Sequence, residues 1–472
     1  MPERWIALPL DKQMYANADA DAVVGLQTAI ENGYLTEQGV QSRFPGLKEF
    51  CTLKDNGRVV LHDFNGDLMA GTSNGRLYRI DKAANVESVP GVAISGGRRI
   101  VFSKTDRELL MAAGGPIIRL RNTATELLSK QAPLSTHVGW IDGYTIAVET
   151  NSGRFYHSAP GVPDSWNPLD TFAADGNPDN INAMLITPYR EIMLGGQNSI
   201  EQFERLPTGT VPFFRRWNIG DGVKFPYCIL HADNAVWTVN QLTELVRLSG
   251  QQSQAASAEM GRLIEAIDDW RDAWIGGYPD RAFHIAGQKF IILQAPFATN
   301  EYGTKGVTLL YDYRQQRFYT LYGWDVQTSV PGRWPGWSHW THWNKVFVGG
   351  EGKVYYADLD TFKNGDQLQR WLVRTAHLSQ GTGFEVKDLR LRVRRGTGTP
   401  ESAATIRVRC SRDGRPFGAW ISRSLGRAGQ REQFINFGSF GLADHVMFEI
   451  SSSEAAPIDL IKAEILADPV GH

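Results

Sequence analysis

The chain of 472 residues is too long for one hydrophobic core, because such cores stop growing at about 250–300 residues. Hydrophobic residues make up 42% and charged residues 21%, which excludes wholesale disorder, and 48 glycines favour an all-β chain with many tight turns. Lys and Arg number 49 against 51 Asp and Glu, so a net charge of −2 provides no basic field and argues against a dedicated DNA-binding protein.

The cysteines and the N-terminal residues indicate in which cellular compartment the protein is expected. Cys51, Cys228 and Cys410 lie far apart, without the spacing of a disulfide framework or a zinc site, so we expect a reducing compartment. The N-terminus has no uninterrupted apolar run of the signal-peptide kind, and no stretch approaches the ~18 apolar residues of a membrane span. The sequence therefore predicts no visible secretion signal and no membrane association.

Residues 1–50 show little periodicity, and we expect an extended N-terminal arm there. From residue 51 to 365 an apolar strand, a small turn and a second apolar strand recur. The second strands are centred on Tyr78, Ile118, Phe155, Glu201, Val246, Leu309 and Val354. Four-stranded propeller blades take about 40–50 residues, so this spacing predicts a six- or seven-bladed β-propeller over 51–365.

One interval between these centres, from Val246 to Leu309, is longer than the others. It contains Met260, Leu263, Ile264 and Ile267, which follow the i, i+3, i+4, i+7 spacing of a helix. We expect a short helix inserted between blades and packed on the rim of the propeller.

Four tryptophans recur at every third position near the end of the propeller: Trp334, Trp337, Trp340 and Trp343. Packing between blades is the simplest interpretation, because each ring carries a large apolar surface and one N–H group that needs a partner. The alternative is a surface for a protein or a sugar, since tryptophan is enriched at binding hot spots. His339 and His342 lie in the same segment, but no third metal ligand is indicated nearby.

Residues 366–472 change to short strands separated by turns, which predicts a C-terminal β-sandwich. Arg390, Arg392 and Arg394 alternate with apolar residues, so they share one strand face. Arg407 and Arg409 repeat the pattern, and we expect them on the adjacent strand, which would make one sheet face strongly basic. A solvated outer face that discourages edge pairing is the simplest interpretation. A contact with a neighbouring subunit, an adaptor protein or DNA is the functional alternative.

The order of several turn motifs resembles a known family. The motifs are Arg43-Phe44-Pro45-Gly46-Leu47, Trp166-Asn167-Pro168-Leu169, Pro178-Asp179-Asn180-Ile181, the segment 195–203, the segment 411–418 and Leu425-Gly426-Arg427. Together they are similar to the tail hub proteins of short-tailed (podovirus-type) phages, also called packaged-DNA stabilisation proteins or tail accessory factors. The resemblance covers most of the chain and rests on structural turns.

This resemblance implies a structural virion protein of the phage tail that is made in the host cytoplasm. Members of the family assemble as a homo-oligomeric ring, with six copies in the best-known cases, below the portal and the head-to-tail adaptor ring. The ring extends and closes the DNA channel, stabilises packaged DNA without sequence-specific binding, and attaches a tail needle and tailspikes or fibres. The arginine-rich strands and the tryptophan segment match no motif of the family.

A carbohydrate-binding or carbohydrate-cleaving β-propeller is the alternative from another functional class. Asp268, Asp269 and Asp272 stand beside Trp270 and Trp274, and a glycosidase needs two carboxyl groups across a cleft. No nucleophile, phosphate-loop or zinc-protease motif is found, so we predict no catalytic residue, no cofactor and no metal site.

Overall fold

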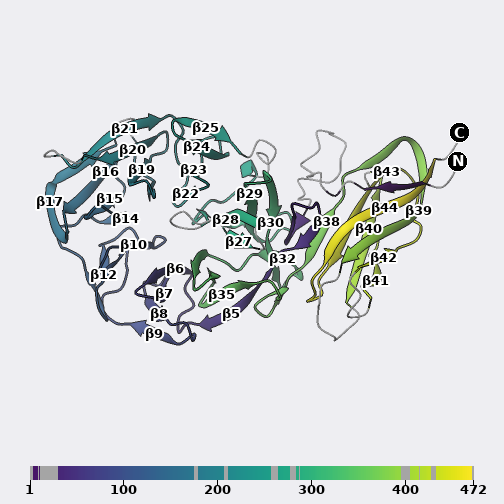
Figure 1. Ribbon diagram of the computed structural model, residues 1–472, viewed down its shortest axis with the longest axis horizontal. Coiled ribbons are helices and arrows are strands. Elements are labelled where there is room, and N and C mark those ends of the chain that lie inside the picture. The colour runs from purple at the N-terminus through teal and green to yellow at the C-terminus, as the bar shows by residue number, and fades with distance from the viewer. Residues whose placement is uncertain are drawn as a thin grey trace.

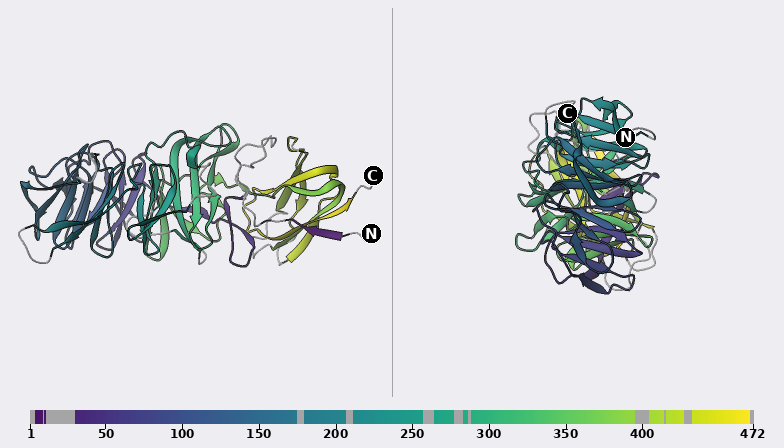
Figure 2. Two further views of the ribbon diagram at one scale, coloured as in Figure 1. Left: turned by 90° about the horizontal axis from the view of Figure 1, so that it is seen from above. Right: turned by 90° about the vertical axis from the view of Figure 1, so that its left-hand side faces the viewer.

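The computed structural model describes residues 4–8, 10, 30–174, 179–206, 211–256, 264–276, 283–285, 288–394, 404–413, 415–426 and 432–469. Small sheets form a ring at the left of Figure 1, and longer strands form a second group at the right. The first strand, β1 (Arg4–Ala7), pairs with the last, β44 (Asp459–Pro469), at the end away from the ring. The views in Figure 2 show an elongated molecule. The expected all-β fold with a β-propeller is confirmed.

Five blades of the ring are separate four-stranded sheets whose antiparallel strands follow one another along the chain. They consist of β6 (Val59–Phe64), β7 (Asp67–Thr72), β8 (Leu77–Ile80) and β9 (Val86–Val89); β10 (Val101–Lys104), β11 (Leu109–Ala112), β12 (Ile118–Leu120) and β13 (Thr125–Leu127); β14 (Ser135–Ile141), β15 (Tyr144–Glu149), β16 (Arg154–Ala159) and β17 (Val162–Ala173); β18 (Ala183–Ile186), β19 (Glu191–Gly195), β20 (Ile200–Arg205) and β21 (Phe213–Ile219); and β22 (Ile229–Ala232), β23 (Ala235–Val239), β24 (Leu245–Ser249) and β25 (Gln252–Ala255). Each blade is one local meander, which is why its spacing could be recognised in the sequence.

The sixth blade joins the two ends of the ring. Its strands are β33 (Ser338–His342), β34 (Lys345–Gly349), β35 (Lys353–Asp358) and β5 (Gly46–Thr52). β5 pairs antiparallel with β35, with Cys51 opposite Val354. The short strands β36 (Lys363–Asn364) and β37 (Gln367–Leu368) continue this sheet beyond β5. The expected boundary between arm and propeller at residues 50–51 therefore falls inside a blade strand, because the ring is closed by a pairing between distant parts of the chain.

A further four-stranded group lies between β22–β25 and the sixth blade. It consists of β26 (Trp274–Ile275), β28 (Gln288–Thr299), β29 (Lys305–Asp312) and β30 (Arg317–Thr320), with β27 (Phe283–Ile285) also paired to β28. Its sheet continues through β2 (Ile30–Glu31) and β38 (Trp371–Arg374) into the C-terminal strands. The described ring thus has six blades of its own and one group shared with the C-terminal strands, which agrees with the expected six or seven.

The C-terminal strands are long and interleaved. β39 (Leu378–Arg394) pairs with β42 (Glu432–Asn436), β43 (Gly441–Ser452) and β44, whereas β40 (Thr405–Arg412) pairs with β41 (Ile421–Ser424) and β43. From the N-terminal segment, β4 (Gln41–Arg43) pairs with β44 and with β3 (Gly33–Leu35). The hairpin of β31 (Tyr322–Asp325) and β32 (Val330–Arg333) forms a small separate sheet. The segment expected to be an extended arm therefore contributes strands to both parts of the molecule.

The expected helical stripe falls mostly outside the described residues, which omit 257–263. Ile264 and Ile267 are described, and both are buried in a core cluster with Trp237 and Leu293. These two side chains pack on the propeller core, while the helical form of the stripe stays a prediction.

Candidate functional site

The alternation of apolar residues with arginines that the sequence predicts for residues 389–394 is present in β39. Leu389, Leu391 and Val393 are at most 1% exposed and belong to the largest core cluster. The intervening arginines point to the opposite side, because successive side chains of a strand alternate between its two faces. The side chains of Arg392 and Arg394 are 42% and 49% exposed, so this face of β39 meets solvent.

Glutamates on the neighbouring strands pair with these arginines. Arg390 Nη2 lies 2.8 Å from an oxygen of Glu464 on β44. Arg392 and Arg394 share Glu432 on β42, at 2.6 Å and 3.2 Å. Hydrogen bonds from both guanidinium groups lower the pKa of Glu432. Two cations compete for one carboxylate here, so the face keeps an excess of positive charge.

Two aromatic rings complete this surface. The guanidinium carbon of Arg390 lies 4.0 Å from the ring centre of Trp5 and 4.9 Å from that of Phe434. Phe434 is a large apolar side chain, yet it is 59% exposed. The guanidinium of Arg390 stacks on its ring in a cation–π contact. We call Trp5, Arg390, Arg392, Arg394 and Phe434 the Arg390 patch. Neither aromatic residue could be assigned to this surface from the sequence, because only strand pairing brings it there. Trp5 arrives through the pairing of β1 with β44, and Phe434 through the pairing of β42 with β39.

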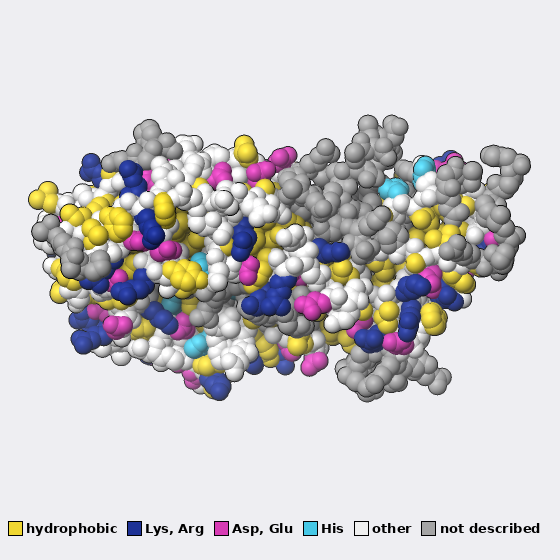
Figure 3. All heavy atoms as spheres, turned by 45° about the horizontal axis from the view of Figure 1, so that its top comes forward, with side chains coloured by type: hydrophobic (Ala, Val, Ile, Leu, Met, Phe, Trp, Pro, Cys, Tyr) yellow, Lys and Arg dark blue, Asp and Glu magenta, His cyan; other side chains and the backbone are white. Residues whose placement is uncertain are grey.

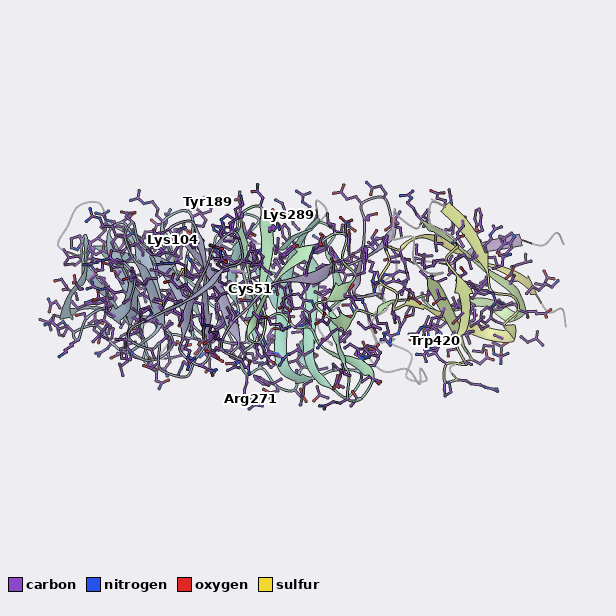
Figure 4. The ribbon with its side chains drawn as sticks, turned by 90° about the horizontal axis from the view of Figure 1, so that it is seen from below. Cys51, Lys104, Tyr189, Arg271, Lys289 and Trp420 are labelled. Atoms are coloured by element: carbon purple, nitrogen blue, oxygen red, sulfur yellow. The ribbon has the colours of Figure 1, made fainter. Side chains whose placement is uncertain are left out.

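Arg407 and Arg409 do not extend this patch. They lie on β40, which pairs with β41 and β43, whereas residues 390–394 pair with β42 and β44. The expectation that the two sets lie on adjacent strands is therefore wrong. Arg409 pairs with Glu449 at 2.5 Å, and both guanidinium groups stack on Trp420, at 4.8 Å and 4.5 Å from its ring centre. Figure 4 shows Trp420 on this C-terminal part of the molecule.

The tryptophan segment is largely internal. Trp334, Trp337 and Trp340 are only 1%, 1% and 2% exposed. The indole N–H of Trp340 donates to Asp63 Oδ1 at 3.0 Å, and the half-buried Trp343 donates to the Gly66 carbonyl at 3.1 Å. Both contacts join β33 and its turn to the first blade. The four tryptophans therefore pack within and between blades, and three of them offer no exposed surface to a partner.

The aspartates of the carbohydrate alternative are already engaged. Asp268 accepts a hydrogen bond of 2.7 Å from the Thr299 amide, and Asp269 pairs with Arg271 at 2.6 Å. These contacts lower the pKa of both carboxyl groups. Asp272 forms an ion pair with Arg58. A glycosidase acid needs a raised pKa, so the electrostatics of Asp268 and Asp269 are opposite to that requirement.

In the part of the chain that the structure describes, no three His, Cys, Asp or Glu side chains gather as a metal site. No described helix has the length and apolar character needed to cross a bilayer. Figure 3 shows Lys and Arg interspersed with Asp and Glu over the visible face.

No protein-family model and no curated protein matches the chain. Among solved structures, virginiamycin B lyase from Staphylococcus aureus is 11% identical, with a TM-score of 0.43 over 65% of this chain and 97% of the other. The WD40 β-propeller domain of Doa1 is 10% identical, with a TM-score of 0.40 over 66% and 97%. BamB from Moraxella catarrhalis is 11% identical, with a TM-score of 0.37 over 75% and 98%. At this level the likenesses carry no information about activity.

Proposed function

We propose that the protein is a structural subunit of the tail hub of a short-tailed phage. In this proposal the chain is made in the host cytoplasm and assembles into a ring, with six copies, below the portal and adaptor rings. The ring extends and closes the DNA channel and attaches the needle and the tailspikes or fibres. Two observations support this proposal: the order of the turn motifs in the sequence, and the Arg390 patch, a surface that suits assembly.

The Arg390 patch is the observation that carries the proposal. Protein interfaces are enriched in aromatic residues and arginine, and their hot spots are enriched in tryptophan and arginine. Phe434 is 59% exposed and lies against Arg390, so an apolar ring and a planar cation are presented together. Arg392 and Arg394 share the single carboxylate of Glu432, so their guanidinium groups can also pair with acidic side chains of a partner. We propose that this patch contacts the neighbouring subunit or the adaptor ring.

The C-terminal strands suit a rigid attachment module, and we propose that they form a β-sandwich. Leu391 of β39 and Val408 of β40 belong to one core cluster, although their strands lie in different parts of the sheet. The arginines that alternate with them stack on different aromatic residues, Phe434 and Trp420. Two sheets packed face to face would place the apolar residues between them and both arginine sets outside.

Retention of DNA in this proposal depends on the shape of the ring. A net charge of −2 supplies little attraction for a polyanion, and contacts with phosphates would be few. A conduit through which DNA must later leave benefits from weak binding. Closing a ring buries the same pair of surfaces at every contact, which is the geometry of cyclic symmetry with head-to-tail interfaces.

The test is the mass of the purified protein, alone and mixed with the adaptor ring, by light scattering and electron microscopy. We expect a six-fold ring, either alone or on the adaptor. The double variant Phe434→Ser, Arg392→Glu should abolish the ring, while Arg76→Glu, in the turn between β7 and β8, should leave it intact. Monomers that ignore the adaptor yet bind or cleave polysaccharide would replace this proposal with the carbohydrate alternative.

A further inference from the structure

A cavity of about 90 Å³ lies on the axis of the propeller. Its lining comes from strands β6, β10, β14, β18, β22, β26 and β33, one from each four-stranded group of the ring. In Figure 1 the labels of β6, β10, β14 and β22 lie toward the centre of the ring. Apolar and aromatic side chains such as Phe102, Met184 and Trp274 form much of the wall. The polar lining residues are Arg99, Tyr227, Ser338 and the histidines His62, His137 and His339. An apolar cavity with a few placed polar groups is the usual form of a small-molecule site.

Arg99, directly before β10, brings a positive charge into this cavity. Its guanidinium carbon lies 5.0 Å from the ring centre of Trp274. Burial lowers the pKa of Arg99 to about 10, which still leaves the side chain charged at neutral pH. No carboxylate of the described residues forms an ion pair with it. A cation in such surroundings is costly unless an anion accompanies it, so the missing counter-charge calls for an explanation.

The carboxyl group that acts on Arg99, that of Asp272, is already paired with another cation. Asp272 attracts Arg99 at a distance, but it forms its ion pair with Arg58, whose guanidinium also stacks on Trp337 at 5.1 Å. A smaller cavity of about 20 Å³ is lined by Arg58, Arg98, Arg99 and Asp272, and it shares Arg99 with the axial cavity. Three guanidinium groups therefore face one carboxylate, which leaves two positive charges in excess at this end of the axis.

The cavity points to a ligand of opposite charge. We propose that the axial cavity binds one small carboxylate anion, held by the Arg99 guanidinium and covered by the aromatic wall. A guanidinium matches a carboxylate through two parallel N–H···O bonds, and it does so better than an ammonium group. Trp274 lies against the Arg99 guanidinium, and the N–H groups of a guanidinium point outward in its own plane, where an anion can accept from them.

The volume limits the ligand to a few heavy atoms. An apolar protein cavity of roughly 150 Å³ accepts benzene, and the axial cavity is smaller. Formate and acetate therefore fit, whereas benzoate should be excluded. His137 also lines the cavity and is 3% exposed, so a bound anion would lie in the neighbourhood of its imidazole.

Calorimetric titration of the full chain with sodium acetate, against sodium chloride at equal ionic strength, tests the proposal. We expect saturable binding of acetate and formate and none of benzoate. Arg99→Gln should weaken acetate binding at least tenfold, and Arg99→Lys should weaken it less because the charge remains. Arg154→Gln, at an exposed position on β16, is the matched control and should bind acetate as the unchanged protein does.

A second readout does not depend on the Arg99 variants folding normally. Saturating acetate at pH 7, where it is an anion, should shift the NMR signals of the His137 ring, because that ring lines the cavity. The proposal is overturned if no saturable heat is found, if Arg99→Gln binds acetate as tightly as the unchanged protein, if chloride competes with equal affinity, or if acetate at pH 7 leaves the His137 ring signals unchanged.

Discussion

Arg374 and Glu449 form a buried ion pair, with 2.7 Å between Nε and Oε1 and side-chain exposures of 3% and 1%. Arg374 lies on β38 and Glu449 on β43, and Arg374 also approaches Glu31 of β2 at 3.3 Å. Glu301, in the turn between β28 and β29 of the ring, lies 3.4 Å from the same guanidinium. The N-terminal segment, the propeller and the C-terminal strands therefore meet in one charge network, which couples their relative positions.

Removing one member of this network should destabilise the protein strongly. Glu449→Gln leaves the buried Arg374 and the adjacent Arg409 short of negative charge, so we expect the free energy of unfolding to fall by about 3–5 kcal/mol. Urea denaturation measures this loss. Glu432→Gln, at an exposed pair with Arg392, is the control and should cost less than about 1 kcal/mol. Equal effects at the two sites would contradict the buried network.

The tryptophan segment should act on stability. Trp334→Ala removes a side chain that is 1% exposed, and we expect a loss of about 3–5 kcal/mol through cavity formation. Trp343→Ala removes a half-buried ring and should cost clearly less. Thermal melting of both variants provides the comparison. A variant that loses a binding partner while keeping its full stability would show instead that the segment is a surface.

His137 should make stability depend on pH. Burial lowers the pKa of His137 to about 3, and the charge of Arg98 adds to this effect. Between its unfolded pKa of 6.5 and pH 3, the unfolded chain binds a proton that the folded chain does not. The contribution of the neutral His137 ring to the free energy of unfolding is therefore fully present above pH 6.5. Below pH 6.5 the free energy of unfolding falls by up to about 1.4 kcal/mol per pH unit.

Urea denaturation at several pH values measures this slope. His137→Leu should reduce the slope by the equivalent of one proton between pH 6 and pH 4, whatever its effect on stability at pH 8. An unchanged slope in the variant would show that His137 is protonated in the folded state.

The cysteines should be poorly reactive in the native protein. Burial raises the pKa of Cys51 and Cys410 to about 12, and burial also raises that of Cys228. The thiolate is the reactive form, and three pH units above the ordinary value of 9.0 reduce its population about a thousandfold at pH 8. Iodoacetamide labelling followed by mass spectrometry should modify all three after denaturation and scarcely any before it. Rapid labelling of one cysteine in the native state would contradict its placement.

The local patterns of the chain were readable without the fold. The blade meanders place their strands close together in sequence, so centres such as Tyr78 and Ile118 recur at roughly the length of one blade. Alternation of Leu389 with Arg390 shows which side of β39 is buried, because side chains alternate along any strand. The burial of Trp334 follows the preference of large rings for the interior.

Tertiary structure decided everything that depends on pairing between distant segments. Cys51 lies opposite Val354, and Trp5 stacks on Arg390, although no local signal links the members of either pair. The separation of Arg407 from Arg390 also follows from which strands pair, since both segments show the same alternation. The position of Arg99 is visible only when the innermost strands of the ring converge on one axis. Periodicity reports the face of a strand, whereas its neighbours are selected by the packing of the whole chain.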